Sequence, residues 1–149
     1  MAQRHFPSAP MTELLLGLVL VPAVDHAVKL LVLTRLGRGT LSLGVLGSLR
    51  LVRAQTWMRR GTRSITPLGM WAVWGVAAAA SAAVCALHPA LGWALGLLVG
   101  GALSHALETS LRGSICDYVC LRFWPAFNLA DVALTTGALG LLLELGRAV

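Results

Sequence analysis

The sequence predicts an all-α integral membrane protein with four transmembrane helices, on the evidence of its composition and of the length of its apolar segments. Of the 149 residues, 57% are hydrophobic and 12% are charged. Long apolar runs lack the periodic polar face that a soluble domain of this size would need. About 20 apolar residues cross the roughly 30 Å of bilayer hydrocarbon. The candidate spans are residues 13–33, 70–87, 91–107 and 127–145, within one membrane domain, 1–149.

The first span also shares a feature with cleaved signal peptides, because Arg4 precedes its apolar run. However, Asp25, His26 and Lys29 lie inside that run, and no convincing small-residue cleavage site follows Leu20. We therefore expect a retained transmembrane helix.

The segment 34–69, between the first two spans, is long enough to fold outside the bilayer. It contains seven of the chain's twelve basic residues: Arg35, Arg38, Arg50, Arg53, Arg59, Arg60 and Arg63. Since the segment lies between two spans, lipid head groups are the expected polyanion, and no nucleic-acid partner is predicted. Apolar residues alternate on both sides of Gly47 and Ser48, which predicts a small β-hairpin, or cradle, on the membrane surface. A short amphipathic helix over 45–60 is the alternative.

The glycines and cysteines of the sequence predict helix packing rather than catalysis or metal binding. Gly92, Gly96 and Gly100 recur at four-residue spacing, so a neighbouring helix can approach closely there, within one chain or between two copies. The Ala-rich second span is the expected partner. The three cysteines are interpreted as small apolar filler, because no histidine pair accompanies Cys116 and Cys120. We expect no metal site.

Polar residues at membrane depth are rarer and more informative. Asp25 and Lys29 are four residues apart, so they share one face of the first helix and can form an ion pair. An isolated charge at mid-bilayer costs about 2.5–3.5 kcal/mol on insertion scales, so such residues usually pair or line a polar cavity. The pair therefore either fixes the helix internally or shapes a site.

A second polar group extends from His105 to Asp131. If the third and fourth spans meet on one side of the bilayer, Asp117 and Asp131 both lie near that surface. Two carboxylates in a poorly hydrated site share a proton, so that one can activate water while the other protonates the carbonyl or the leaving amine. Alternatively, Asp131 only complements the helix dipole and Asp117 is a loop residue.

The segment "FWPAFNLADVAL" resembles the signature at the last helix of signal peptidase II, the lipoprotein signal peptidase family. The family element Phe-Asn-x-Ala-Asp matches Phe127, Asn128, Ala130 and Asp131. Upstream, "GGALSHALETSLRGSICDYV" resembles the run Gly-Gly-Ala-Leu-Gly-Asn-x-x-Asp-Arg, which leads to Gly-x-Val-x-Asp-Phe and places the other catalytic aspartate at Asp117. The family's Asp-x-x-x-Lys matches Asp25 and Lys29.

The resemblance implies an aspartic endopeptidase that removes the signal peptide from diacylglyceryl-modified prolipoproteins, before the lipidated cysteine. Asp117 and Asp131 would be the catalytic pair, with no metal or cofactor. Asn128 would orient the pair or the substrate backbone, and Asp25 and Lys29 would support the site. Membrane lipids would hold the acyl chains of the substrate.

The sequence departs from the family pattern in the residues that surround the substrate. His105 replaces the family's asparagine, and Glu108 with Thr109 replaces its Asp-Arg pair. Arg112, one helical turn further on, is the expected substitute for the missing arginine. The cradle element Asn-x-Gly-x-x-Phe is absent from "LGRGTLSLGVLG". A paralogue that binds lipidated peptides or a partner helix without cleaving them is the alternative function, and a small transporter is a third.

The resemblance and the charge distribution predict opposite orientations in the membrane. The family places both termini in the cytoplasm and the aspartates near the outer face of the bacterial inner membrane. Nine arginines nevertheless lie in 34–69 and 108–126, against Arg4 and Arg147 on the other side. The positive-inside rule would therefore place the aspartates in the cytoplasm. We expect the family orientation, in which the arginines bind anionic head groups.

Overall fold

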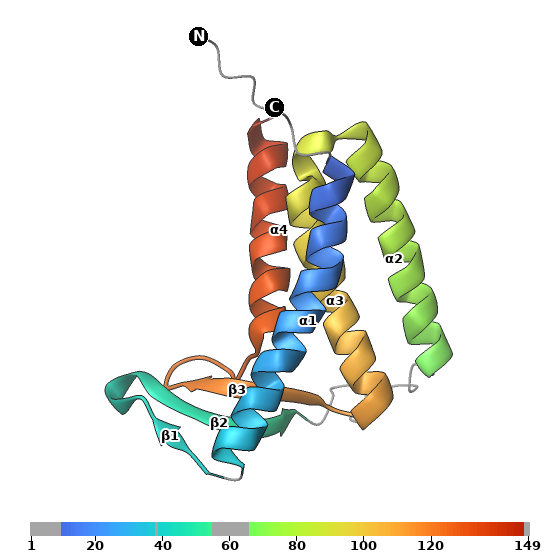
Figure 1. The fold of residues 1–149 in the computed structure, drawn as a ribbon. Coiled ribbons are helices and arrows are strands. Elements are labelled where there is room, and N and C mark those ends of the chain that lie inside the picture. The colour runs from blue at the N-terminus through green and yellow to red at the C-terminus, as the bar shows by residue number, and fades with distance from the viewer. Residues whose placement is uncertain (1–9, 38, 55–65, 148–149) are drawn as a thin grey trace.

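The computed structural model describes residues 10–37, 39–54 and 66–147, and its main body is a bundle of long helices. These are α1 (Pro10–Leu36), α2 (Pro67–Leu87), α3 (Gly92–Arg112) and α4 (Leu129–Arg147). All four are long and apolar enough to cross a membrane, and a small sheet lies across one end of the bundle (Figure 1). The predicted fold class is therefore confirmed. The third helix extends to Arg112, beyond the expected end at residue 107.

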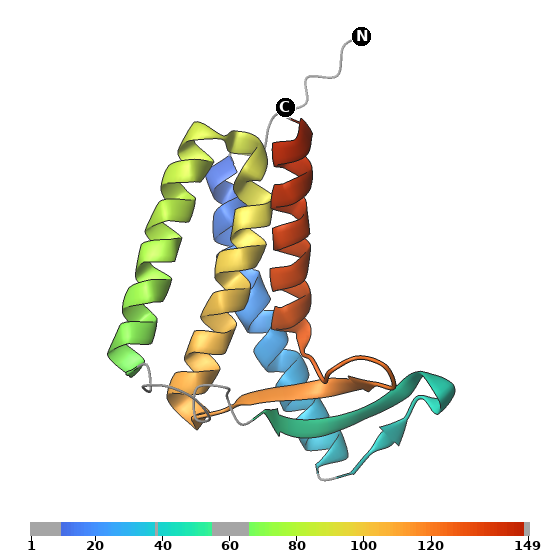
Figure 2. The ribbon, with the colours of Figure 1, turned by 180° about the vertical axis from the view of Figure 1, so that it is seen from behind.

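Helix α3 is the centre of the bundle. It packs most extensively against α1 and α4, and less against α2, which stands at the side of the bundle (Figure 2). Ten residues of α3 are buried, whereas Cys85 is the buried residue of α2. Most of the α2 surface therefore faces the surrounding hydrocarbon rather than the rest of the chain.

The glycine face of α3 contacts α1, so the expectation that α2 would fill it was wrong. A Cβ on Gly96 would lie 2.8 Å from the carbonyl oxygen of Glu13, and one on Gly100 would clash with the backbone of Gly17. Gly17 itself lies against Gly96. Because α1 has its own glycine at the crossing, both backbones approach more closely than the alanines of α2 would allow.

The sheet contains β1 (Leu41–Ser42), β2 (Gly47–Ala54) and β3 (Ile115–Leu121), paired antiparallel in that order. The predicted hairpin is formed by β1 and β2, with Leu41 opposite Leu49. Its turn was expected at Gly47 and Ser48, but the chain reverses over 43–46, through the 3₁₀ turn Gly44–Leu46. Gly44 has a φ of 65°, which supplies the left-handed residue that the reversal needs.

The alternative of an amphipathic helix over 45–60 is contradicted as far as residue 54, and residues 55–60 lie outside the described part. The third strand was not predicted from the sequence, where 108–126 was interpreted as a loop. Residues 115–121 instead pair along β2, with Val119 opposite Leu49 and Asp117 opposite Val52. The strand β3, which contains Asp117, lies at one end of the helical bundle (Figure 1).

Candidate active site

A buried charge cluster joins α1 to α3. Lys29 Nζ lies 2.7 Å from Asp25 Oδ2 on its own helix and 2.6 Å from Glu108 Oε2 on α3. The three side chains are at most 1% exposed. The predicted pairing of Asp25 with Lys29 is therefore present, and Glu108 completes it. Two carboxylates share one ammonium group, and the guanidinium of Arg112 supplies a second positive charge, 3.2 Å from Glu108 Oε1.

Asp25 also joins α1 to the start of α4. Its Oδ2 accepts a hydrogen bond from Ser104 Oγ at 2.5 Å, and its Oδ1 accepts one from the backbone N–H of Ala130 at 3.3 Å. The first backbone N–H groups of a helix have no partner within the helix, so a buried carboxylate is a favourable acceptor for them. Asp25 thus fixes the residue next to Asp131.

Asn128 links Asp117 and Asp131. Its Nδ2 donates to Asp117 Oδ1 at 2.7 Å. Its Oδ1 accepts from the backbone N–H of Asp131 at 3.1 Å, while Asp131 Oδ2 accepts from the backbone N–H of Asn128 at 2.9 Å. This reciprocal pair has the geometry of a capping box at the start of α4. The structure therefore brings together Asp117, Asn128 and Asp131.

The strand and the helix are also joined directly, which makes this arrangement rigid. The backbone of Phe127 folds back onto β3 and pairs with Val119. The hydroxyl oxygen of Tyr118 accepts a hydrogen bond from the backbone N–H of Leu129 at 3.2 Å. Asp117 on β3 and Asp131 on α4 consequently have little freedom to separate.

The two carboxylates differ in their surroundings. Asp117 is buried, and this burial raises its pKa above the ordinary value of 3.8, against the lowering effect of the hydrogen bond from Asn128. The nearby Asp131 carboxylate raises it further. Burial likewise raises the pKa of Tyr118 to about 12, so its hydroxyl stays protonated. The side chain of Asp131 is 36% exposed.

His105 and Arg112 occupy different places relative to these carboxylates. His105 Nε2 lies 3.4 Å from Asp131 Oδ1. Arg112 instead contacts Glu108, and its side chain is 47% exposed. Arg112 therefore completes the buried cluster rather than the aspartate pair.

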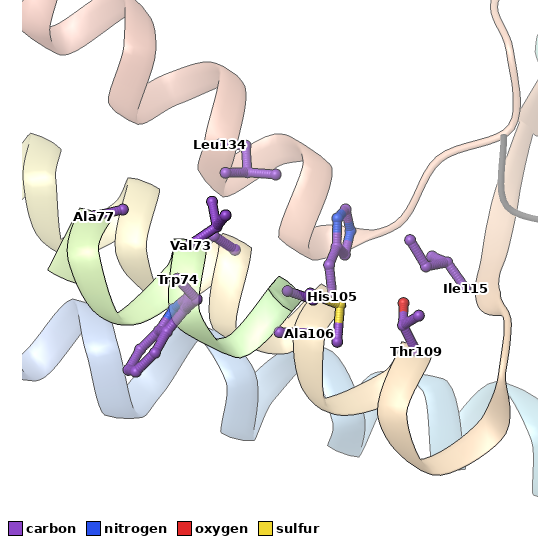
Figure 3. A pocket seen from close by; sticks show the side chains of 10 residues that line it. Val73, Trp74, Ala77, His105, Ala106, Thr109, Ile115 and Leu134 are labelled. Carbon is purple, nitrogen blue, oxygen red and sulfur yellow. The ribbon is translucent and has the colours of Figure 1, made fainter. Parts of the chain in front are cut away.

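A cavity of about 350 Å³ opens beside His105, between α2, α3 and α4. Figure 3 shows the ring of His105 directed from α3 toward α4, with Val73 and Leu134 on the facing helices. The wall is almost entirely apolar, and it is formed by Met70, Val73, Trp74, Ala77, Ala102, His105, Ala106, Thr109, Ile115 and Leu134. The cavity can therefore accept an apolar group within reach of His105.

Ser104 and Tyr118 were not predicted from the sequence, and Glu108 was noted only as a departure from the family pattern. Ser104 and Glu108 are four residues apart, so their shared helix face was a usable signal. The role of Tyr118 depends on a strand that was not predicted either. Within the described residues, no group of three or more His, Cys, Asp or Glu side chains has the geometry of a metal site.

A family model described as signal peptidase (SPase) II matches residues 17–147. The chain belongs to this family. A "Lipoprotein signal peptidase" of Pelotomaculum thermopropionicum is 46% identical over 50 residues, which cover 34% of this chain and 33% of that protein. One of Methylobacterium sp. (strain 4-46) is 39% identical over 88 residues, or 53% of each chain. The match to these two relatives thus spans about a third to about half of their length.

Two solved structures of a bacterial membrane enzyme, determined by the in meso method, have the same fold. The structure at 2.3 Å resolution gives a TM-score of 0.72 at 20% identity, over 91% of this chain and 88% of the other. The structure at 1.9 Å gives 0.70 at 20% identity, over 90% and 92%. The signal peptidase II chain described here therefore shares its fold with membrane enzymes over nearly its whole length.

The buried cluster predicts a sharp difference between its two cations. Lys29→Met would leave Asp25 and Glu108 buried without their shared ammonium group, and we expect a loss of about 3–5 kcal/mol in the free energy of unfolding. Arg112→Met removes a half-exposed partner of Glu108 and should cost less than about 1 kcal/mol. Unfolding in mixed detergent micelles measures both. Equal losses in the free energy of unfolding for the two variants would contradict this prediction, because they would show that the buried Lys29 contributes no more to stability than the half-exposed Arg112.

The raised pKa of Asp117 predicts a pH-dependent stability. The folded protein binds the proton of the Asp117 carboxyl group more tightly than the unfolded chain does. The free energy of unfolding therefore falls as pH rises from the ordinary pKa of 3.8 to the raised pKa of the folded state. We expect Asp117→Asn to gain stability relative to the wild type as pH rises and to lose that advantage below the ordinary pKa. Thermal unfolding in detergent across this range tests it, and a variant that loses relative stability with rising pH would refute it.

Proposed function

We propose that this chain is a membrane aspartic endopeptidase that removes the signal peptide from diacylglyceryl-modified prolipoproteins, cutting before the lipidated cysteine. The observation that carries the proposal is the pair of carboxylates, Asp117 and Asp131, both held by the residue Asn128. Its side-chain Nδ2 donates to Asp117, and its backbone N–H donates to Asp131. Membership of the signal peptidase II family and the names of the relatives support the substrate class. No metal or cofactor takes part in the proposed reaction.

The proposed chemistry needs one ionised and one protonated carboxyl group. The ionised carboxylate takes a proton from a water molecule, whose oxygen attacks the scissile carbonyl carbon. The protonated carboxyl group donates its proton to the carbonyl oxygen, which forms a tetrahedral intermediate. When the C–N bond breaks, the leaving amine takes up the proton that came from water. The hydroxyl group formed from the carbonyl oxygen returns its proton to the carboxylate that donated it, which re-forms the C=O bond and restores the starting pair. The sharing of one proton between neighbouring carboxylates is the logic of aspartic proteases.

The other side chains support the pair. Asn128 orients both carboxylates, and Asp25 with Lys29 fixes the start of α4 from the first helix. His105 stands at the substrate side of this arrangement, where it lines the cavity. Arg112 supports the site through its ion pair with Glu108 of the buried cluster. The acyl chains of the substrate remain among membrane lipids, so the protein has only to present the peptide bond to the carboxylates.

The tip of the sheet supports contact with lipid beside the site. Val45 and Leu46 are 82% and 69% exposed, and Phe123 and Trp124 are 90% and 67% exposed. The backbone N–H of Arg122 donates to the carbonyl oxygen of Leu46, so the two apolar segments lie together. Exposed aromatic and apolar side chains of this kind suit the boundary between head groups and hydrocarbon.

A cleavage assay tests the proposed function. Purified protein in lipid is given a diacylglyceryl-prolipoprotein, and the product is followed by its gel shift. We expect Asp117→Asn and Asp131→Asn each to lower the rate by at least about 100-fold, because each removes a group that moves a proton. Glu144→Gln, which breaks an exposed ion pair with Arg147, is the matched control and should cleave normally. Unimpaired cleavage by either aspartate variant, or none by folded wild type, would refute the proposal.

The proposed location is the bacterial inner membrane, with the aspartates near the outer face and both termini in the cytoplasm. The start of α1 and the end of α4 lie at the same end of the bundle, opposite the sheet (Figure 1). Arg35, Arg50, Arg112 and Arg122 belong to the sheet end or the helix ends next to it, where anionic head groups can balance their charge.

The orientation predicts a cytoplasmic C-terminus. A fluorescent protein that matures only in the cytoplasm, fused after Val149, should therefore be fluorescent. A periplasm-dependent phosphatase at the same position should be inactive, and the same phosphatase inserted in segment 55–65 should be active. An active phosphatase after Val149 would reverse the proposed orientation.

A further inference from the structure

His105 is a titratable side chain in contact with both the aspartate pair and the cavity. Its Nε2 lies 3.4 Å from Asp131 Oδ1 and 3.4 Å from Asn128 Oδ1. The side chain is 20% exposed, and its ring forms part of the cavity wall (Figure 3). The imidazole therefore stands between the apolar cavity and the carboxylate of Asp131.

The hydrogen bonds of Asn128 determine what His105 can do. Because Asn128 Nδ2 donates to Asp117, its Oδ1 is the atom that faces His105. The same Oδ1 already accepts from the backbone N–H of Asp131. Both atoms near Nε2 are thus acceptors when Asp131 is ionised, and a ring nitrogen without a proton would face two oxygen lone pairs. With Asp131 ionised, this geometry favours the tautomer with a proton on Nε2.

The charged groups near His105 lie on α1, α3, α4 and β3, and none lies on the part of α2 that lines the cavity. Asp131 lies on α4, and Asp117 on β3 interacts electrostatically with both Asp131 and His105. On α3, Glu108 is engaged by Lys29 of α1 and by Arg112. Lys29 is also paired with Asp25 on α1, so the two carboxylates and the two cations of this cluster balance. The α2 residues at the cavity are Met70, Val73, Trp74 and Ala77, none of which titrates. The unbalanced charge facing His105 is therefore that of the aspartate pair.

We propose that His105 is a positioning residue of the reaction: its Nε2–H faces the Asp131 carboxylate, keeps it ionised, and leaves the proton shared by the two aspartates on Asp117. This inference rests on the proposed function and assigns the roles within it. Asp131 is the base that takes the proton from water, and Asp117 is the acid that donates to the carbonyl oxygen. The buried position of Asp117 and the partly exposed position of Asp131 agree with these roles.

The charge of His105 has a consequence that an uncharged residue at this position lacks. Histidine becomes positively charged in mildly acidic solution, where an aspartate base would begin to take up a proton. A positive charge within ion-pair distance opposes that uptake. The activity should therefore persist to lower pH than it would with asparagine at position 105, the residue of the family pattern.

The pH dependence of kcat/KM tests the inference with His105→Asn. In reconstituted protein cleaving a diacylglyceryl-prolipoprotein, we expect the acidic limb of the profile to move up by about one pH unit. His88→Asn, at the far end of α2 and exposed, makes the same chemical change away from the site and should leave the profile in place. If His105 only fills space, His105→Asn lowers the rate equally at every pH, and that outcome would overturn the proposal.

A second measurement does not depend on turnover. The chain has three aspartates, Asp25, Asp117 and Asp131, so ¹³C-aspartate labelling gives three carboxyl signals in the infrared spectrum. Subtraction of the spectrum of Asp131→Asn identifies the signal of Asp131. We expect this carboxylate to protonate at higher pH in His105→Asn than in the wild type, and an unchanged titration would overturn the inference.

The two measurements separate the inference from the proposed function. If His105→Asn shifts the infrared titration of Asp131 but the wild type cleaves no prolipoprotein, the coupling of His105 to Asp131 is supported and the peptidase is refuted. Cleavage that depends on both aspartates, with no shift in either measurement, would support the peptidase and refute the role of His105.

Discussion

The carboxylate of Asp25 is the constraint on which the rest of the structure depends. It is fully buried in α1 and accepts hydrogen bonds from three helices: from Lys29 on its own helix, from Ser104 on α3 and from the backbone of Ala130 on α4. Burial of an isolated carboxylate is very costly, so these bonds must all be kept. The close packing of α1 on α3, where Gly17 meets Gly96, brings the bonding groups within reach.

The position of Asp131 follows from this constraint through the backbone. Ala130 is held by Asp25, and the next residue closes the capping box with Asn128. Asn128 in turn donates a hydrogen bond to Asp117, which lies on β3. The geometry of the two aspartates is therefore determined by one buried carboxylate and one amide, each of which has its polar atoms engaged. Such a connected polar network tolerates little change in any member.

Local patterns made the helices and the Asp25–Lys29 pair predictable from sequence, because apolar length and four-residue spacing act within one element. The features that were missed depend on partners far apart in the chain. Strand β3 is recognisable only beside β2, and Tyr118 acquires its role only when β3 meets Leu129. The glycines of α3 indicated a close approach, but the choice of α1 over α2 depended on Gly17. The grouping of Asp117 with Asp131 came from the family resemblance, since spacing alone also allowed a simple helix cap.

The departures from the family pattern are distributed between two faces of α3. Ser104 and Glu108 face α1, where Glu108 still supplies a carboxylate to Lys29 and gains Arg112 one turn later. His105 and Thr109 are also four residues apart, and both line the cavity. On the first face the change from Asp to Glu preserves the charge balance that the buried cluster requires. On the second face an amide and a guanidinium are replaced by an imidazole and a hydroxyl, which changes both the charge and the donors offered to a bound group. One face of α3 therefore carries the side chains that join it to α1, and the other carries the side chains that line the cavity.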